Sequence, residues 1–394
     1  MISPRRVVVA GHICLDIIPR IERIPAQGLS GLLQPGHLFN IGPAALSTGG
    51  AVSNTGLALH KLGVPTCLVA KVGADPLAET IRAVVDAFGP GLSDGLVTDP
   101  AVGSSYTIII SAPEVDRIFW HCPAANDAFG ADDIDDDLLR QAALLHFGYP
   151  PLMRRIVEDG AAELLALLRR AKVAGISTSL DMSFPDPESV GGQADWRAIL
   201  AAALPDVDIF TPSIDELLFM QQRATYERLA ARPGGLLAHV TPELLSGLSA
   251  ELLAWGAKIV MIKTGPRGAY LRTAGVPRLA QMGRGVPGDL AAWADRELWA
   301  PCFAVDVVGT TGSGDATIAG FLAALLRDRS PAEAMTAAVA VGACNVEAAD
   351  ALGGLRTWEE TLARIAAGWP RCSWPLAAPG WEWSATLNLW QKAH

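Results

Sequence analysis

A glycine-rich turn that leads directly into a carboxylate and an apolar helix is the part of this sequence best suited to chemistry. The segment VVGTTGSGDATIAGFLAALL covers residues 307–326, with the turn at 309–314 and the carboxylate at Asp315. Glycines let consecutive backbone N–H groups point into one concavity, and the following helix start adds partial positive charge, so the turn favours an anion. A carboxylate there would repel a phosphate, but it is useful where an incoming hydroxyl must lose its proton beside that phosphate. The competing interpretation is a structural turn with Asp315 as an ordinary helix-start residue.

Two common nucleotide-binding loops do not describe this turn. A Walker A loop is excluded, because G-x-x-x-x-G-K-[ST] occurs nowhere in the chain and no lysine follows these glycines. A dinucleotide-binding loop is a poor match, because such loops lie near the start of their domain and usually lack a central aspartate.

The elements that must position this turn alternate along the chain between short β-branched runs and longer Ala- and Leu-rich segments. The runs expected as strands are residues 7–10, 66–70, 144–147, 177–181, 208–211, 258–263 and 269–272. The segments expected as helices are residues 51–62, 76–88, 152–174, 214–222, 242–255, 315–327 and 331–348. The repeated strand–helix order predicts an α/β fold with a doubly wound, mostly parallel sheet covered on both faces.

Two extended, turn-rich segments interrupt this alternation, at residues 13–46 and 104–121. In the second segment, residues 106–111 and 117–120 flank a turn at 112–116, which predicts a hairpin. Two such excursions from an α/β core can pair, so we expect a small β-sheet lid.

Two further segments stand outside the regular pattern. The Gly- and Pro-rich stretch 275–288 is expected to be an inserted loop. The tail after Ala367 carries five tryptophans and is too aromatic for a disordered tag. We expect the tail to dock either on the body of the protein or on a second subunit.

The composition is that of a globular protein without a general attraction for polyanions. The 394 residues are half apolar and less than one fifth charged, and the length allows one large domain or two smaller ones. A net charge of −10 provides no basic field, so nucleic acid is not expected as a partner. ATP can still bind such a chain, because phosphate sites are local and Mg²⁺ brings its own charge.

Neither the cysteines nor the apolar runs indicate a secreted or membrane-spanning protein. The six cysteines are scattered and are expected to be buried hydrophobes, not a disulfide framework or a metal site. The N-terminal apolar run is interrupted by Gly11, His12 and Asp16, so it is interpreted as a first strand and not as a signal peptide. No uninterrupted apolar stretch reaches the length of about 18 residues that suggests a membrane span. The expected location is the cytoplasm.

The turn and its aspartate resemble the C-terminal signature of pfkB-family carbohydrate kinases, written D-T-x-G-A-G-D. The resemblance implies that Asp315 is the catalytic base and that the backbone of Gly312, Ser313 and Gly314 forms an anion hole for the transferred phosphoryl group. The first aspartate of the signature is replaced here by Gly309, so activation by a monovalent cation is in doubt.

A second segment, STGGAVSNTGLALHKLG at residues 47–63, is similar to the family's N-terminal signature G-G-x-x-x-N. The resemblance implies that Gly49 and Gly50 allow sugar hydroxyls to approach and that Asn54 hydrogen-bonds them. Without the family, the same residues are also compatible with a loop and a helix N-cap. The family's following strand–turn–helix is matched by KVGADPLAE at 71–79.

Further substrate contacts are implied at the first strand and at the end of the hairpin. Asp16, in GHICLDIIP, matches the family's substrate-binding aspartate, although Cys14 stands where related chains often have asparagine. A lone aspartate after a strand is also a common turn residue. RIFWHCPAAN at residues 117–126 resembles a lid-to-core segment ending in P-G-A-N, which makes Asn126 a candidate substrate ligand.

The nucleotide half of the family pattern also has counterparts. DIFTPSIDE at 208–216 resembles T-P-N-x-x-E, which implies that Glu216 organises water around Mg²⁺ and phosphate, with Ser213 in place of the asparagine. An exposed first-turn acid is the alternative for Glu216. VMIKTGPRGAYL at 260–271 resembles the T-x-G-x-x-G unit that borders ATP. The residues implied at the nucleotide are Lys263, Gly265, Gly268 and, in a later loop, Asn345.

Taken together, the resemblance implies a ribokinase-like kinase domain over residues 1–368, with lid segments near 13–46 and 104–121 and a Trp-rich extension at 369–394. The implied reaction is ATP- and Mg²⁺-dependent phosphorylation of a primary hydroxyl of a sugar-like molecule. A nucleoside kinase is an alternative, because Phe119 and Trp120 could pack on a base.

A non-catalytic binding protein is the second alternative, favoured by the departures from the family pattern at Cys14, Ser213 and Gly309. Edge strands of an open lid commonly pair, so a homodimer through the lid is a further expectation.

Overall fold

The strands of the chain form two separate β-sheets. In the computed structural model the described residues are 5–25, 28–112, 117–374, 376 and 378–393. Eleven strands form the large sheet, in the order β14-β15-β13-β12-β11-β10-β9-β8-β1-β4-β5, and four more form a separate sheet, the lid, in the order β3-β2-β6-β7. Neighbouring strands from β5 to β11 run parallel, while β12, β13, β15 and β14 add an antiparallel edge.

The strands are β1 Val7–Gly11, β2 Cys14–Pro19, β3 Ala44–Gly49, β4 Thr66–Val72, β5 Leu96–Thr98, β6 Tyr106–Ile110, β7 Ile118–Cys122, β8 Leu144–Gly148, β9 Ser177–Leu180, β10 Ile209–Phe210, β11 Ile259–Lys263, β12 Ala269–Thr273, β13 Glu297–Ala300, β14 Trp381–Ser384 and β15 Leu389–Lys392. The longer helices are α2 Ala51–Lys61, α3 Pro76–Asp86, α5 Arg154–Val173, α7 Trp196–Ala203, α8 Ile214–Gln221, α9 Arg223–Ala230, α10 Pro242–Trp255, α13 Ser313–Leu325, α14 Pro331–Asn345 and α15 Trp358–Ala366. The short ones are α1 Leu29–Leu32, α4 Asp136–Gln141, α6 Val190–Gln193, α11 Val276–Leu279 and α12 Leu290–Trp293.

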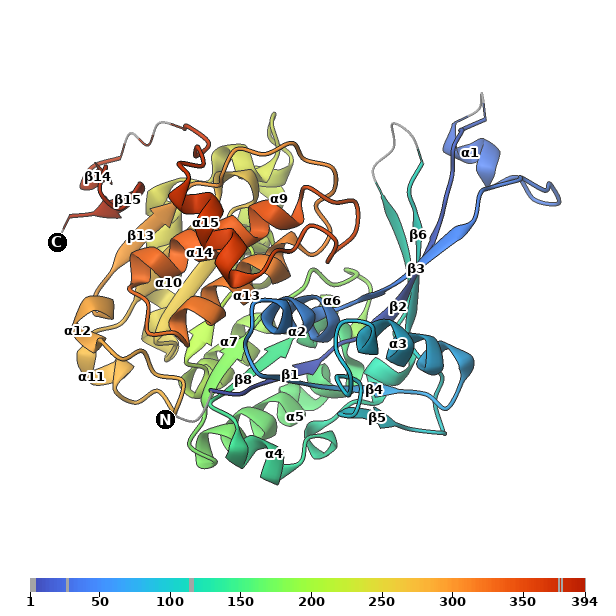
Figure 1. Ribbon diagram of the computed structural model, residues 1–394, viewed down its shortest axis with the longest axis horizontal. Helices are drawn as coiled ribbons and strands as arrows, with labels where there is room; N and C mark the ends of the chain where they lie inside the picture. Colours follow the sequence, from blue (N-terminus) through green and yellow to red (C-terminus); the bar gives the residue numbers. More distant parts are fainter. Residues whose placement is uncertain (1–4, 26–27, 113–116, 375, 377, 394) are drawn as a thin grey trace.

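The large sheet is covered on both faces, as its sequence pattern predicts. Val7 and Val9 of β1 pack with α2, α3, α13 and α14, whereas Val8 and Ala10 pack with α5, α7, α8 and α10. Successive strand residues point to opposite faces, so a run that is buried throughout must lie between two helical layers. Figure 1 shows α2 and α13 on one side of β1 and β8, with α4 and α5 on the other.

Each strand and helix expected from the sequence occurs, but two segments differ in detail. The helix expected at 152–174 begins only at Arg154, after a proline-containing 3-10 turn, and is interrupted around Gly160, whose φ of 67° leaves the right-handed helix. The loop expected at 275–288 contains the short helix α11, and its Leu279 is fully buried, so the segment packs into the core.

The register of the four lid strands places a polar row and an apolar row on opposite faces of the lid. Ser47, Asp16, Thr107 and His121 form one cross-strand row. The next row consists of Leu46, Ile17, Ile108 and Trp120. Adjacent rows point to opposite faces of a sheet. The predicted hairpin is present as β6 and β7, and most of its predicted turn lies outside the described residues.

The Trp-rich tail docks on the body of this same chain. Its strands β14 and β15 extend the large sheet at β13, where Trp299 pairs with Trp390. The ring of Trp374 lies 4.6 Å from that of Trp299, and Trp381 is buried beside Tyr270. Among the described helices, none has the length and apolar character needed to cross a membrane.

Candidate active site

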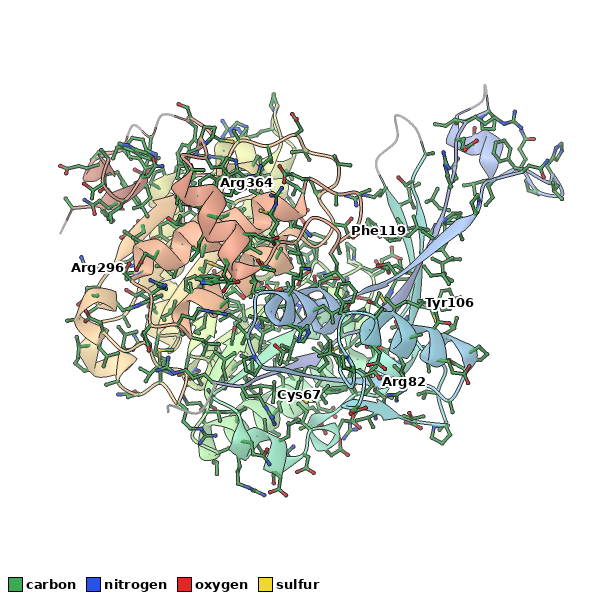
Figure 2. The ribbon with its side chains drawn as sticks, viewed as in Figure 1. Cys67, Arg82, Tyr106, Phe119, Arg296 and Arg364 are labelled. Carbon is green, nitrogen blue, oxygen red and sulfur yellow. The ribbon has the colours of Figure 1, made fainter. Side chains whose placement is uncertain are left out.

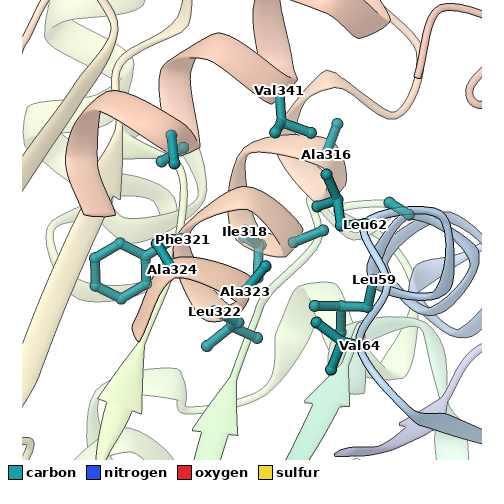
Figure 3. Close-up of a cluster of buried hydrophobic side chains, with 14 of the residues drawn as sticks. Leu59, Leu62, Val64, Ala316, Ile318, Phe321, Leu322, Ala323, Ala324 and Val341 are labelled. Carbon is teal, nitrogen blue, oxygen red and sulfur yellow. The ribbon is translucent and has the colours of Figure 1, made fainter. Parts of the chain in front are cut away.

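The packing of α13 determines where Asp315 lies. This helix is apolar on all sides and is enclosed by α14 and α2, with Phe321 and Leu322 among the buried side chains that Figure 3 shows. Gly320 permits the close approach of α14, since a Cβ there would lie 2.7 Å from the Ala337 carbonyl oxygen. The helix begins after Gly312, whose φ of 71° is left-handed. Asp315 therefore lies in the first turn and is only 3% exposed.

Three side chains donate hydrogen bonds to the Asp315 carboxylate. Asn54 Nδ2 lies 3.1 Å from Oδ2, and Thr55 Oγ1 lies 3.0 Å from Oδ1. The Tyr149 hydroxyl lies 2.7 Å from Oδ2. Asn54 and Thr55 are neighbours on α2, and Tyr149 follows β8, so one carboxylate joins three distant parts of the chain. Two of the residues predicted from separate motifs, Asn54 and Asp315, thus meet.

Two glycines bring together the segments that are predicted to bind substrate. A Cβ on Gly49 would lie 2.5 Å from Asp16 Oδ2, and a Cβ on Gly50 would lie 2.5 Å from both His12 Nδ1 and the His12 carbonyl oxygen. Gly50 also has a φ of 89° at the start of α2. Burial raises the pKa of Asp16 to about 6, although hydrogen bonds from Cys14 and Thr107 oppose the shift.

A cleft of about 920 Å³ separates the lid from the ends of the core strands. Its polar wall includes Asp16, Asn54 and Tyr149, together with Thr311 and Gly312 of the glycine-rich turn at 309–314, the anion turn. Phe119 comes from the lid and lies on its body-facing side, whereas Tyr106 lies on the opposite side (Figure 2). The cleft therefore brings four of the predicted substrate ligands, Asp16, Gly49, Gly50 and Asn54, together with the glycine-rich turn, and its Tyr149 is bonded to the predicted base.

A pair of histidines joins the core to the lid within this cleft. His12 Nε2 and His121 Nε2 are 3.2 Å apart, and His121 Nδ1 lies 3.0 Å from Thr107 Oγ1. Burial lowers the pKa of His12, with the neighbouring His121 adding to the effect, and burial also lowers the pKa of His121. Both shifts favour neutral rings that can share one proton between them.

A buried ion pair lies on the other side of the anion turn. Lys263 Nζ is 2.7 Å from Asp181 Oδ1, and a Cβ on Gly314 would lie 3.5 Å from that same ammonium nitrogen. Burial raises the pKa of Asp181 to about 8, and Lys263 opposes the shift. Glu216 is near enough to act on both charges. The turn is thus flanked by one cation and two carboxylates.

The lid also reaches the anion turn. Arg117 Nη2 donates to Thr310 Oγ1 at 2.9 Å, and the Ser313 N–H donates to the Thr310 carbonyl at 3.3 Å. The first N–H groups of a helix have no intrahelical acceptor. Those of Gly314 and Asp315 at the start of α13 are therefore suited to an anion held over the turn.

Other predicted residues have roles in supporting the backbone. Asn126 is fully buried outside the cleft, and its amide bonds both the N–H and the carbonyl of Ile13. Asn345 is also buried and donates to the Ala351 carbonyl at 2.5 Å, next to Gly312. Asn126 is predicted to contact the substrate and Asn345 to contact adenine. Both contacts stay predictions, and the hydrogen bonds of the two side chains to the backbone do not favour them.

The residues expected around the nucleotide form turns. Glu216 accepts from the Ser213 N–H at 2.7 Å in a capping box, and it remains partly exposed. Gly265 has a φ of 57°, and a Cβ on Gly268 would overlap the Ala300 carbonyl oxygen. These glycines are therefore needed for the backbone path, whatever binds beside it.

Four side chains at the site were missed by the sequence motifs: His12, Thr55, Tyr149 and Asp181. His12, Tyr149 and Asp181 directly follow β1, β8 and β9, and ligands commonly bind beyond the carboxyl ends of such parallel strands. A search of strand ends for polar side chains could have found these three.

A comparison with protein-family models finds a match over most of the chain. A family model described as "pfkB family carbohydrate kinase" matches residues 5–358. Probable fructokinase-6, chloroplastic, from Arabidopsis thaliana is 26% identical over 364 residues, which cover 90% of this chain and 80% of that protein. The ATP-dependent ribose-1-phosphate kinase of Halopiger xanaduensis is 27% identical over 344 residues, covering 86% and 90%.

Solved structures show the same fold. Arabidopsis thaliana ribokinase complexed with ribose and ATP has a TM-score of 0.67 and 20% identity, over 92% of this chain and 98% of that one. Fructokinase with bound ATP from Xylella fastidiosa also has a TM-score of 0.67, with 18% identity and the same coverage.

Proposed function

Because the chain belongs to the pfkB family of carbohydrate kinases, we propose that it transfers the γ-phosphoryl group of ATP to a primary hydroxyl of a sugar, with Asp315 as the general base. One observation carries the proposal. The Asp315 carboxylate lies in the first turn of α13 and is bonded at 3.1 Å to Asn54, which lines the cleft that Asp16 also faces. A hydroxyl held by Asp16 and Asn54 can therefore reach a base and an anion site at once.

The proposed reaction is an in-line displacement. The acceptor oxygen bonds to the γ-phosphorus as its proton passes to Asp315, and the bond to the β-phosphate oxygen breaks. The N–H groups at the start of α13 and the Lys263 ammonium beside Gly314 stabilise the negative charge that spreads over the phosphoryl oxygens.

The residues next to the turn fit a magnesium nucleotide. Asp181 Oδ2 is buried without a hydrogen-bond partner among the described residues, and Glu216 presents a second carboxylate in the same region. Mg²⁺ takes oxygen ligands and usually keeps several waters, so these carboxylates together with ATP phosphates suit it. Bound there, it would neutralise phosphate charge. Asp181 and Glu216 would hold the ion, directly or through water, and Lys263 would hold the phosphates.

The charges of the cleft favour a neutral acceptor over a phosphorylated one. Its lining includes the acidic side chains Asp16, Asp127, Asp186 and Glu188. Among the described lining residues the cation is Arg154, which is already paired with Glu158. A sugar phosphate would meet a net negative wall. The fructokinase-like relatives therefore suggest the acceptor better than the ribose-1-phosphate kinase does.

The test is a panel of acceptors scored by ADP formation with ATP and Mg²⁺. We expect turnover with fructose or ribose and little with ribose 1-phosphate. Asp315→Asn should lower turnover by about 10²–10⁴-fold, because an amide cannot accept the proton, while ATP binding by thermal shift persists. Equal turnover by the variant and the natural enzyme would remove Asp315 from the mechanism. Failure to bind ATP would favour a non-catalytic binding protein.

A nucleoside kinase is the second candidate, and Phe119 is the observation that favours it. This ring is 53% exposed and lines the cleft, where it could stack on a base. Adenosine and uridine therefore belong in the panel. Turnover with a nucleoside that exceeds turnover with every free sugar would select this candidate.

A further inference from the structure

The base of the proposed reaction is already hydrogen-bonded on its cleft side. The Tyr149 hydroxyl donates to Asp315 Oδ2 at 2.7 Å, the shortest of the three bonds to that carboxylate. Tyr149 lines the cleft and is partly exposed. In this chain, therefore, a side-chain hydroxyl is bonded to the atom that an acceptor hydroxyl must approach.

The other two donors come from neighbouring residues of α2. A carboxylate offers about four acceptor positions over its two oxygens. Thr55 is fully buried outside the cleft and takes one on Oδ1, and Asn54 comes from the same helix and takes one on Oδ2. Thr55 also donates through a hydroxyl, but from a buried position outside the cleft, so among the three donors Tyr149 has the hydroxyl that lies on the side from which a substrate alcohol would approach.

We propose that the Tyr149 hydroxyl occupies the acceptor position on Asp315 until a sugar hydroxyl displaces it, so that water is not activated there and ATP is not hydrolysed. The inference rests on the proposed kinase function. Tyr149 is in this view a positioning residue, because it acts through Asp315.

The reaction that Tyr149 would suppress is simple hydrolysis. A water oxygen would bond to the γ-phosphorus, its proton would pass to Asp315, and the bond to the β-phosphate oxygen would break. The products would be ADP and inorganic phosphate. Any kinase whose base can accept a proton from a sugar hydroxyl is exposed to this reaction, because water is also a small hydroxyl compound.

A sugar can displace the tyrosine more readily than water can. The phenol and the sugar hydroxyl each form one hydrogen bond to the carboxylate, so replacing one by the other changes the free energy of that bond little. A sugar also gains contacts with Asp16 and Asn54, and this binding energy can drive the displacement. Water brings no such contacts.

The backbone and the surroundings of Tyr149 are consistent with a residue held for function. Its φ of 65° and ψ of 41° are left-handed, which is unfavourable for a residue with a side chain and is often found at functional sites. Its ring lies 6.0 Å from the His12 ring, which borders the same cleft. Burial, and then the charge of Asp315, raise the pKa of Tyr149 well above its ordinary value, so the phenol stays a donor.

The experiment compares Tyr149→Phe with Thr55→Val. Phenylalanine keeps the ring and removes one oxygen, which leaves a space of about the size of a water beside the carboxylate. Thr55→Val also removes one donor to Asp315, but on the buried side away from the cleft. Release of inorganic phosphate from ATP and Mg²⁺ without sugar is measured, together with ADP formation with fructose and with ribose.

We expect Tyr149→Phe to raise sugar-independent phosphate release by about tenfold, the value of a lost hydrogen bond to a charged group. Thr55→Val should slow hydrolysis and transfer together and leave their ratio unchanged. Adding Asp315→Asn to the Tyr149 variant should abolish the extra hydrolysis, which shows that the same base is used.

Phosphate release by Tyr149→Phe at or below the natural level, in a variant that melts like the natural protein, would overturn the inference. An equal change in the ratio of ATP hydrolysis to sugar phosphorylation in Tyr149→Phe and in Thr55→Val would also overturn it. If the natural enzyme phosphorylated no acceptor in the panel, the proposed function would fail; turnover with an acceptor but no rise in phosphate release by Tyr149→Phe would overturn the role of Tyr149 alone.

Discussion

At the scale of single residues, Asp16 combines a proposed ligand role with a cost to stability. It lies on the polar side of the lid, and burial raises the pKa of its carboxyl group to about 6 from the ordinary 3.8. That gap corresponds to roughly 3 kcal/mol at most, since a tenfold change in acid strength is worth about 1.36 kcal/mol. The folded chain therefore holds the proton more tightly than the unfolded chain does.

The pH dependence of this cost has a definite sign. Below about pH 4 both the folded and the unfolded chain carry Asp16 protonated, so the carboxyl group costs nothing. As pH rises towards about 6 the unfolded chain loses its proton first, and stability falls. The full cost remains above that pH.

We therefore predict that Asp16→Asn raises the melting temperature at about pH 8 and leaves it unchanged at about pH 3, while the KM for the sugar rises about tenfold. Asp186→Asn is the matched control, because Asp186 borders the same cleft but is exposed. Asp186→Asn should change neither the melting temperature nor the KM by much. A melting temperature of Asp16→Asn that drops near pH 8 would contradict the assigned cost of the buried charge.

Short sequence motifs predict only part of the site. Asp315, Asn54 and Asp16 each belong to a recognisable segment, and they line or border one cleft. Tyr149 and His12 could not be found in this way, because their importance comes from contacts across the fold. A tyrosine between a glycine and a proline carries no local sign that it will reach Asp315.

At the scale of elements, the junction between β3 and α2 determines how close the lid comes to the core. Gly49 pairs with Cys14 in the lid, and a Cβ at Gly49 would meet Asp16 Oδ2 at 2.5 Å. The sequence indicates a glycine pair before a helix. It does not indicate which side chain would occupy the space left by the missing Cβ.

We predict that Gly49→Ala raises the KM for the sugar by about tenfold or more, because the Asp16 carboxylate must move away from the acceptor. Gly247→Ala is the matched control. Gly247 lies in the exposed part of α10, and no described atom comes near its missing Cβ, so alanine should add about 0.5–1 kcal/mol of stability and leave the KM unchanged. Steady-state kinetics and thermal melting of both variants provide the measurement. An unchanged KM in Gly49→Ala would mean that Asp16 does not bind the acceptor.

The regular elements could be predicted well because each carries its own periodic pattern. The parallel strands β1, β8 and β11 are mostly apolar and buried, and the helices between the strands are long enough to show their period. The break in α5 at Gly160 could not be predicted, because a glycine inside a helix is often tolerated. The helix at 276–279 was missed because four residues are too few to show a period.

At the scale of the whole molecule, the tail and the lid each carry apolar side chains that another part of the protein or a second chain can cover. The sequence left open whether the tail docks on its own chain or on a second one. Its strands β14 and β15 complete the large sheet, where the ring of Trp374 lies tilted against that of Trp299. Composition alone cannot decide such a question, because it says that a segment must be buried but not against what.

The lid leaves a comparable surface uncovered. The row that contains Leu46, Ile17, Ile108 and Trp120 lies on the face opposite to Asp16. Leu46 is 52% and Trp120 is 47% exposed, although the base of this face packs near α3. Apolar side chains gathered on one exposed sheet face are typical of an association surface. We propose that a second copy of this chain covers the row.

Sedimentation velocity on the natural protein and on Trp120→Glu tests this proposal. We expect a dimer for the natural chain and a monomer for the variant, because the new charge would be buried without a partner at the centre of the contact. Val173→Glu is the matched control, since Val173 is 90% exposed at the end of α5, away from the lid, and its change should leave the dimer intact. A monomeric natural protein, or a Trp120 variant that stays dimeric, would show that the lid row is not the contact. Because Trp120 and His121 alternate on β7, a dimer on the apolar face would also stiffen the strand that carries His121 into the cleft.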